Sequence, residues 1–173
     1  MMDYFTEYIV RRKKSAIDIL IIAGIIIAAL VLSFIGLQFC FFPLIGQFVF
    51  LLIAGVIWGA WFLITNRNVE FEYIVTNGEL DVDKITARRK RKRLLSVPAK
   101  EIELIAPISD HSADTVTNII DASRNVSNDE SLCYLIAVKD GVRTKLIFNP
   151  SEKMIKIFKK FRPQAVKVSV PNE

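Results

Sequence analysis

The chain has 173 residues, of which 52% are hydrophobic, and it carries 23 Lys or Arg and 18 Asp or Glu side chains. These residues are segregated, because residues 15–65 contain one charged side chain, Asp18, while residues 66–173 contain 19 basic and 15 acidic ones, a net charge of +4. This asymmetry excludes an ordinary cytosolic domain, a disordered chain and a collagen-like repeat. It predicts membrane-spanning helices followed by a small soluble domain.

Residues 1–14 precede the first apolar stretch and form a separate N-terminal segment in this interpretation. Phe5, Tyr8 and Ile9 would fall on one side of a short helix, which would then anchor the segment at the membrane interface. A frayed terminus is the alternative interpretation.

Residues 15–65 are predicted to form a transmembrane helical hairpin, with spans at about residues 19–37 and 44–64. Ser33 is the only polar side chain of the first span and Gln47 of the second. At about 1.5 Å per residue the first span would be roughly 28 Å long, which matches the hydrocarbon core of a bilayer. The short connection through Pro43 allows only an antiparallel pair.

Basic residues near the ends of the spans predict the orientation. Arg11, Arg12, Lys13 and Lys14 precede the first span and Arg67 follows the second, whereas the connection has no basic residue. The positive-inside rule therefore predicts a two-span protein of the cell membrane with both termini in the cytoplasm. A cleaved signal peptide is the competing interpretation, but the first apolar stretch is longer than a typical signal core and a second span follows at once.

Small residues recur four apart in the spans, notably at Gly55 and Gly59. Such spacing lets helices approach closely, either within one hairpin, which we favour, or between two copies. Asp18 is expected to reach the interface or to pair with a nearby basic residue. Cys40 and Cys133 would lie on opposite sides of the membrane, so no disulfide is expected between them.

Residues 66–165 are predicted to form a cytoplasmic domain rich in antiparallel strands. Apolar and acidic residues alternate from Val69 to Val75, and Asn77-Gly78 follows as a tight hairpin turn. The returning strand keeps Leu80 and Val82 on the apolar face and then loses register, which predicts a bulge near Asp83 and Lys84. Further strands are predicted at residues 93–97, 102–106, 118–121, 132–138 and 142–148.

Two connections and a helix complete the predicted domain. Residues 108–130 are polar and form a long loop, and Asp140-Gly141 makes a second tight hairpin. Asn149 is predicted to cap a helix whose apolar face holds Met154, Ile157, Phe158 and Phe161, and Arg162-Pro163 should end it. Residues 166–173 are left as a tail.

The order of these elements resembles the pleckstrin-homology (PH) superfold, in which seven antiparallel strands are closed by a C-terminal helix. The segments from Tyr73 to Asp81, Arg89 to Arg93 and Phe148 to Met154 are similar to those of an uncharacterised family of small bacterial membrane proteins with PH-like domains. The resemblance implies a two-helix transmembrane hairpin followed by an α+β PH-like barrel with one C-terminal helix. Its motifs are turns and core positions, so it implies no reaction.

Six consecutive cations form the strongest charge feature: Arg88, Arg89, Lys90, Arg91, Lys92 and Arg93. The first strand of the domain starts three residues after the second span, so the strand that follows the Asn77-Gly78 turn should return this run towards the headgroups. Contact with anionic lipid is the interpretation we favour. The alternatives are a solvated edge strand and nucleic-acid binding, which the lack of interleaved aromatic residues disfavours.

The sequence offers little chemistry. His111 is the only histidine and lies in the polar loop, and Glu70, Glu72, Asp81 and Asp83 are expected at solvent-facing or bulge positions, where they balance cations. We therefore expect no catalytic residue, metal or cofactor. The sequence favours a non-enzymatic, membrane-anchored module that binds a protein partner or anionic lipid, and the alternative is a structural subunit that acts through its hairpin, packing on Gly55 and Gly59 against a membrane protein or a second copy.

Overall fold

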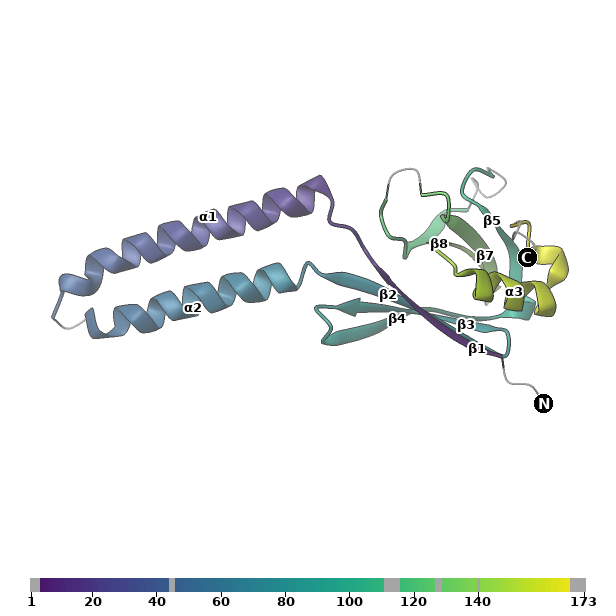
Figure 1. Cartoon of the computed structure of the whole chain (residues 1–173), viewed down its shortest axis with the longest axis horizontal. Coiled ribbons are helices and arrows are strands. Elements are labelled where there is room, and N and C mark those ends of the chain that lie inside the picture. Colours follow the sequence, from purple (N-terminus) through teal and green to yellow (C-terminus); the bar gives the residue numbers. More distant parts are fainter. Residues whose placement is uncertain (1–3, 44–45, 111–115, 127–128, 140, 169–173) are drawn as a thin grey trace. The chain divides into compact units, whose positions relative to one another are not determined.

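A computed structural model describes residues 4–43, 46–110, 116–126, 129–139 and 141–168 (Figure 1). The chain forms two compact units. One comprises residues 14–68, and the other combines the described residues up to 13 with those from 69 onwards. The N-terminal segment is therefore part of the β domain rather than a separate piece.

The first unit contains the two predicted apolar helices, α1 (Ala16–Gln38) and α2 (Gly46–Thr65), with a short 3-10 turn, η1 (Phe39–Phe41), after α1. Both are long and apolar enough to cross a membrane. The backbone N–H of Ser15 donates to the Asp18 carboxylate at 3.1 Å, and Arg67 Nη1 lies 3.4 Å from the same group. The one carboxylate of this unit is thus paired with a basic residue, as predicted.

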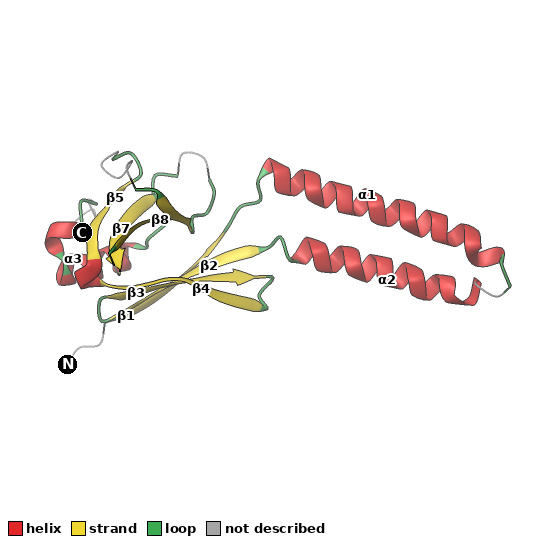
Figure 2. Cartoon of the chain, turned by 180° about the vertical axis from the view of Figure 1, so that it is seen from behind, coloured by secondary structure: helices red, strands yellow, loops and turns green. Residues whose placement is uncertain are grey.

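Sheet A of the second unit has the strand order β1-β2-β3-β4, all antiparallel (Figure 2). Its strands are β1 (Phe5–Arg11), β2 (Val69–Thr76), β3 (Glu79–Thr86) and β4 (Lys90–Pro98). The predicted N-terminal helix is wrong, because this segment is strand β1. Tyr8 and Val10 alternate with Glu7 and Ile9, so a period of two places the first pair towards the core.

The turn and the bulge of sheet A can be compared with the prediction directly. Asn77 and Gly78 have φ angles of +49° and +87°, as a tight hairpin turn requires, and the β2–β3 pairing stays regular. The shift lies between β3 and β4 instead, where Val82 pairs with Leu95 but Asp83 pairs with Arg93. The predicted bulge is therefore at the expected height of β3 but in the ladder with β4. Phe71 pairs with Lys84, so no shift between β2 and β3 brings Ile85 to the core face.

Sheet B has the order β5-β7-β8-β6 and is mixed. It is built from β5 (Ile102–Pro107), β6 (Asn118–Asp121), β7 (Cys133–Lys139) and β8 (Val142–Phe148), and a 3-10 turn, η2 (Ala99–Glu101), joins it to sheet A. The strands β6 and β8 run parallel, which the long predicted loop before β6 allows. The predicted closed barrel is wrong, since the described strands form two separate four-stranded sheets.

Helix α3 (Glu152–Phe161) follows β8, and a 3-10 turn, η4 (Pro163–Ala165), ends the helical region. Its N-cap is Ser151, whose hydroxyl accepts from the Met154 N–H at 3.4 Å, and not Asn149. The prediction failed because Asn149 is fully buried and its side chain is used inside the domain. Beyond the helix, the Lys167 N–H donates to the Ile105 carbonyl at 2.8 Å, which attaches the start of the predicted tail to β5.

The larger of two hydrophobic clusters among the described residues forms the main core of the second unit, and a smaller one gathers Ala106, Val116, Tyr134 and Ile136. The main core lies between the inner face of sheet A, sheet B and α3, and its largest fully buried side chains include Tyr73, Leu80, Leu135, Phe148 and Phe158. The face of sheet A that carries Glu72 and Asp83 points the other way, and we call it the outer face.

Candidate functional site

The basic run occupies the β3–β4 turn and the first half of β4. Because side chains alternate along a strand, Arg91 and Arg93 lie on the outer face of sheet A, whereas Lys90 and Lys92 lie on the inner face. The six cations, predicted as one patch, are thus divided between two faces.

Arginines of the outer face are held by carboxylates from neighbouring strands. Arg91 Nη2 lies 2.8 Å from Glu72 Oε2. Arg93 Nη1 lies 2.8 Å from Asp81 Oδ2, and its Nε lies 2.5 Å from Asp83 Oδ1. The hydrogen bond with Asp83 is the main cause that raises the pKa of Arg93 above its ordinary value. These two arginines therefore cross-link β4 to β3 and β2.

Two of these carboxylates, which the sequence predicts at solvent-facing or bulge positions, are buried. Glu72 is 3% exposed and Asp83 is 2% exposed, although both lie on the outer face. Burial raises the pKa of Glu72; the nearby Arg91 opposes this shift, and Glu7, on the adjacent strand, adds to it. Their predicted role of balancing neighbouring cations is nevertheless the one that the contacts show.

A fourth carboxylate, Glu70, pairs with two more arginines. Glu70 Oε1 lies 3.0 Å from Arg11 Nε and 3.5 Å from Arg88 Nε. Arg11 is the last residue of β1 and pairs directly with Glu70 on β2, so the N-terminal basic residues reach the same end of sheet A as the β3–β4 turn. We call this the junction end, because the chain leaves it at Lys13 and returns to it at Val69.

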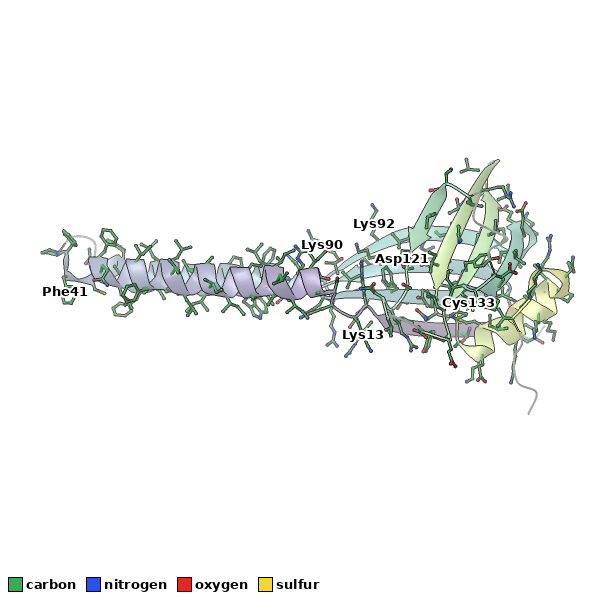
Figure 3. All side chains as sticks on the ribbon, turned by 90° about the horizontal axis from the view of Figure 1, so that it is seen from above. Lys13, Phe41, Lys90, Lys92, Asp121 and Cys133 are labelled. Carbon is green, nitrogen blue, oxygen red and sulfur yellow. The ribbon has the colours of Figure 1, made fainter. Side chains whose placement is uncertain are left out.

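Five further cations lie at the junction end. Within the described part of the chain, Lys84, Lys90 and Lys92 take part in no ion pair, and the same is true of Arg12 and Lys13. Figure 3 shows Lys90 and Lys92 at the β4 edge of sheet A and Lys13 at the β1 edge. Backbone hydrogen bonds fix the two N-terminal residues, since the Arg12 N–H donates to Val69 O at 3.0 Å and the Lys13 N–H to Arg124 O at 2.7 Å.

The β3–β4 turn itself has a strained backbone. Ala87 and Arg88 both have φ angles of +54°, a left-handed conformation that costs a non-glycine residue about 1–2 kcal/mol. Strain of this kind persists where the surrounding structure fixes it, and it often marks a functional position. Beside the turn is an open hollow of about 300 Å³, lined by Glu70, Ile85 and the residues from Arg88 to Arg91.

Asn149 is a buried polar centre that the sequence did not reveal. Its side-chain oxygen accepts from the Arg124 N–H at 2.9 Å, and its amide nitrogen donates to Asp129 Oδ2 and Ser131 Oγ, each at 2.9 Å. Tyr73 donates its hydroxyl to the Ala122 carbonyl at 2.5 Å, and burial raises its pKa. These bonds attach the segment after β6 to the core, and their role is structural.

His111 and Cys133 are two further residues that the sequence offered for chemistry. His111 lies outside the described residues. The buried Cys133 thiol has its pKa raised to about 11, chiefly by burial, so it is a poor nucleophile. Among the described residues no cluster of three or more His, Cys, Asp or Glu could hold a metal ion.

Gly55 and Gly59 lie in the other unit, on α2. A Cβ atom added at either glycine would have no atom within 4 Å. The two glycines therefore do not mark a close contact between the two helices of one hairpin, which is the packing favoured from the sequence. Gly59 lines an apolar groove of about 270 Å³ with Ala28, Ala29 and other apolar residues of both helices. Their packing against another chain stays a prediction.

The chain combines two apolar helices with a small domain of two β-sheets and a C-terminal helix, and one end of sheet A is cationic. These features define a protein with candidate membrane spans and a small PH-like domain. A comparison with protein families agrees with this class: the family described as bacterial PH-like domain (DUF6106) matches residues 2–168. The chain belongs to this family, and the match includes β1 and both apolar helices. Searches of curated proteins and of solved structures returned no match.

Proposed function

We propose that the protein is a non-enzymatic module of the cell membrane, anchored by α1 and α2 with both termini in the cytoplasm, whose PH-like domain contacts anionic lipid headgroups. The observation that carries the proposal is the register of sheet A. Val69 pairs with Thr86, and Thr86 pairs with Lys90, so the strained basic turn is at the junction end. Only three residues separate Val69 from the last residue of α2, and three residues span at most about 11 Å.

The basic residues at the junction end favour contact with anionic headgroups over exposure to solvent alone. Each Lys or Arg near an anionic leaflet contributes about 1 kcal/mol. The paired arginines Arg91 and Arg93 contribute less, because their charges are already balanced by carboxylates. The strained turn keeps Arg88 and Arg89 at the tip of the β3–β4 connection. Lipid contact accounts for the position of these basic residues without any catalytic role.

Amide hydrogen exchange of the full-length protein in nanodiscs tests this proposal. We expect exchange in residues 84–93 to slow when phosphatidylglycerol is added to phosphatidylcholine nanodiscs, and the difference to shrink at high salt. Residues 153–160 of α3 serve as an internal reference that should not change. Equal exchange of residues 84–93 in the two lipid compositions would refute lipid contact and favour a protein partner for the domain.

A second candidate function is structural, with the hairpin assembling against another membrane protein or a second copy. The open space at Gly55 and Gly59 and the apolar groove beside Gly59 favour it. Chemical crosslinking with a reagent that does not react with cysteine, carried out in native membranes, would test this role. Gly55→Leu and Gly59→Leu should abolish a crosslinked species that the control Ala54→Leu retains, and survival of that species in all three variants would exclude this role.

A further inference from the structure

We infer that the domain contacts the plane of an anionic leaflet through cations from two distant parts of the sequence: Arg12 and Lys13 after β1, and Lys84, Lys90 and Lys92 on β3 and β4. This inference rests on the proposed function and makes it more specific. We call these five residues the cationic rim.

Charge balance selects the members of the rim. Arg11 and Arg88 share Glu70, while Arg91 and Arg93 are held by Glu72, Asp81 and Asp83. The rim residues make no ion pair within the described parts of the chain. Their charges are therefore available to an external anion, whereas using Arg91 or Arg93 would require a buried carboxylate to lose its partner.

Two rim residues face each other across the sheet. Lys84 on β3 pairs directly with Lys92 on β4. Directly opposed residues have Cβ atoms about 4.5–5.5 Å apart, and like charges at that spacing repel. An anion that contacts both ammonium groups would relieve this repulsion, so the pair gains from a ligand that supplies negative charge.

The rim spans the width of sheet A. Lys13 is at the β1 edge, and Lys90 and Lys92 are at the β4 edge (Figure 3). Three inter-strand spacings of about 4.8 Å separate these edges, a distance of roughly 14 Å. Cations spread over such a width suit several neighbouring headgroups better than one phosphate held in a pocket, so the geometry points to a leaflet of monoanionic lipid.

Strand pairing makes the two parts of the rim one surface. The Arg12 N–H bonds to Val69 O, Val69 pairs with Thr86, and Thr86 pairs with Lys90. One ladder therefore runs from the N-terminal cations to the β4 cations. A change at Arg12 and Lys13 should consequently alter the lipid contact of residues 84–93, although more than 70 residues separate them in sequence.

Hydrogen exchange in nanodiscs, with the full-length chain, tests the inference through two variants. The first carries Lys84→Gln, Lys90→Gln and Lys92→Gln, and the second carries Arg12→Gln and Lys13→Gln, with Arg11 and Lys14 kept to preserve the orientation of the helices. In phosphatidylglycerol nanodiscs we expect the lipid-dependent protection of residues 84–93 to fall roughly 150-fold in the first variant and roughly 30-fold in the second, at about 1 kcal/mol for each cation removed. The matched control carries Lys153→Gln, Lys156→Gln and Lys159→Gln on α3 and should behave as the unmodified protein.

The set of outcomes distinguishes a failure of this inference from a failure of the proposed function. If the unmodified protein shows no lipid-dependent protection, both fail. If it does and the Arg12 and Lys13 variant protects residues 84–93 normally, the two-part rim is wrong while lipid contact stands. An equal loss in the α3 control means that net charge alone matters. Protection by inorganic phosphate in neutral nanodiscs, beyond that by chloride at equal ionic strength, would show that the ligand is a soluble anion.

Discussion

Arg93 and Lys92 are adjacent on β4 but should differ sharply in their effect on stability. Arg93 is half-exposed and bonds Asp83, which is 2% exposed. Breaking a fully buried ion pair costs about 3–5 kcal/mol, whereas an exposed pair contributes about 0–1 kcal/mol. With one buried and one half-exposed partner, Arg93→Gln should lower the free energy of unfolding by about 2 kcal/mol. Lys92→Gln removes a charge opposite Lys84 and should change it by less than about 0.5 kcal/mol.

Thermal unfolding of the full-length protein in a neutral detergent at pH 7, followed by near-ultraviolet circular dichroism, measures this difference. For a domain of this size about 1 kcal/mol shifts Tm by roughly 3–5 °C, so Arg93→Gln should lower Tm by about 6–10 °C. Asp83→Asn should cost a similar amount, and the double variant should cost less than the sum. Equal Tm values for Arg93→Gln and Lys92→Gln would refute the division of β4 into a structural and a free face.

Three further variants probe strain, burial and titration. Arg88→Gly should be more stable than Arg88→Gln by about 0.5–1 kcal/mol, because only glycine relieves the positive φ; equal Tm values would show that the turn is not strained. Asn149→Ala should cost about 2–3 kcal/mol by leaving buried groups unpaired, whereas a loss below about 0.5 kcal/mol in denaturant unfolding would contradict its central role. Because the folded state raises the pKa of Glu72, this carboxyl favours folding most below its ordinary value of 4.5, and that contribution falls as pH rises through the raised pKa. As pH rises from about 4 to 7, the Tm of Glu72→Gln should therefore rise relative to that of the unmodified protein. A constant Tm difference across that range would exclude the raised pKa.

Local patterns predicted most elements of the chain because their signals lie within a few residues. The Asn77-Gly78 turn and the alternation around it fix the register of β2 and β3, and the observed bounds of β5, β6, β7 and β8 lie within one residue of those expected. The uninterrupted apolar stretches likewise predicted α1 and α2, since length and composition decide them.

Non-local partners explain what the sequence could not show. Strand β1 pairs with β2, although both apolar helices lie between these strands in the sequence, so no local feature reveals that residues 5–11 have a partner. Strand β4 begins at Lys90 rather than Arg93, because carboxylates on β2 and β3 balance cations that locally resemble a solvated turn. The alternation of β4 already separated Lys90 and Lys92 from Arg91 and Arg93, and this was the signal that could have divided the basic run.

Since β1 and β2 are hydrogen-bonded neighbours, the helical hairpin is an insertion within one continuous sheet. A fragment starting at residue 66 would lack β1 and expose the β2 edge, which would favour aggregation during expression. Arg12 already bonds to Val69, so a two-residue Asn-Gly turn in place of residues 13–68 would convert β1 and β2 into an ordinary hairpin. During synthesis, by the same logic, the first strand must wait until both helices have left the ribosome before sheet A can close.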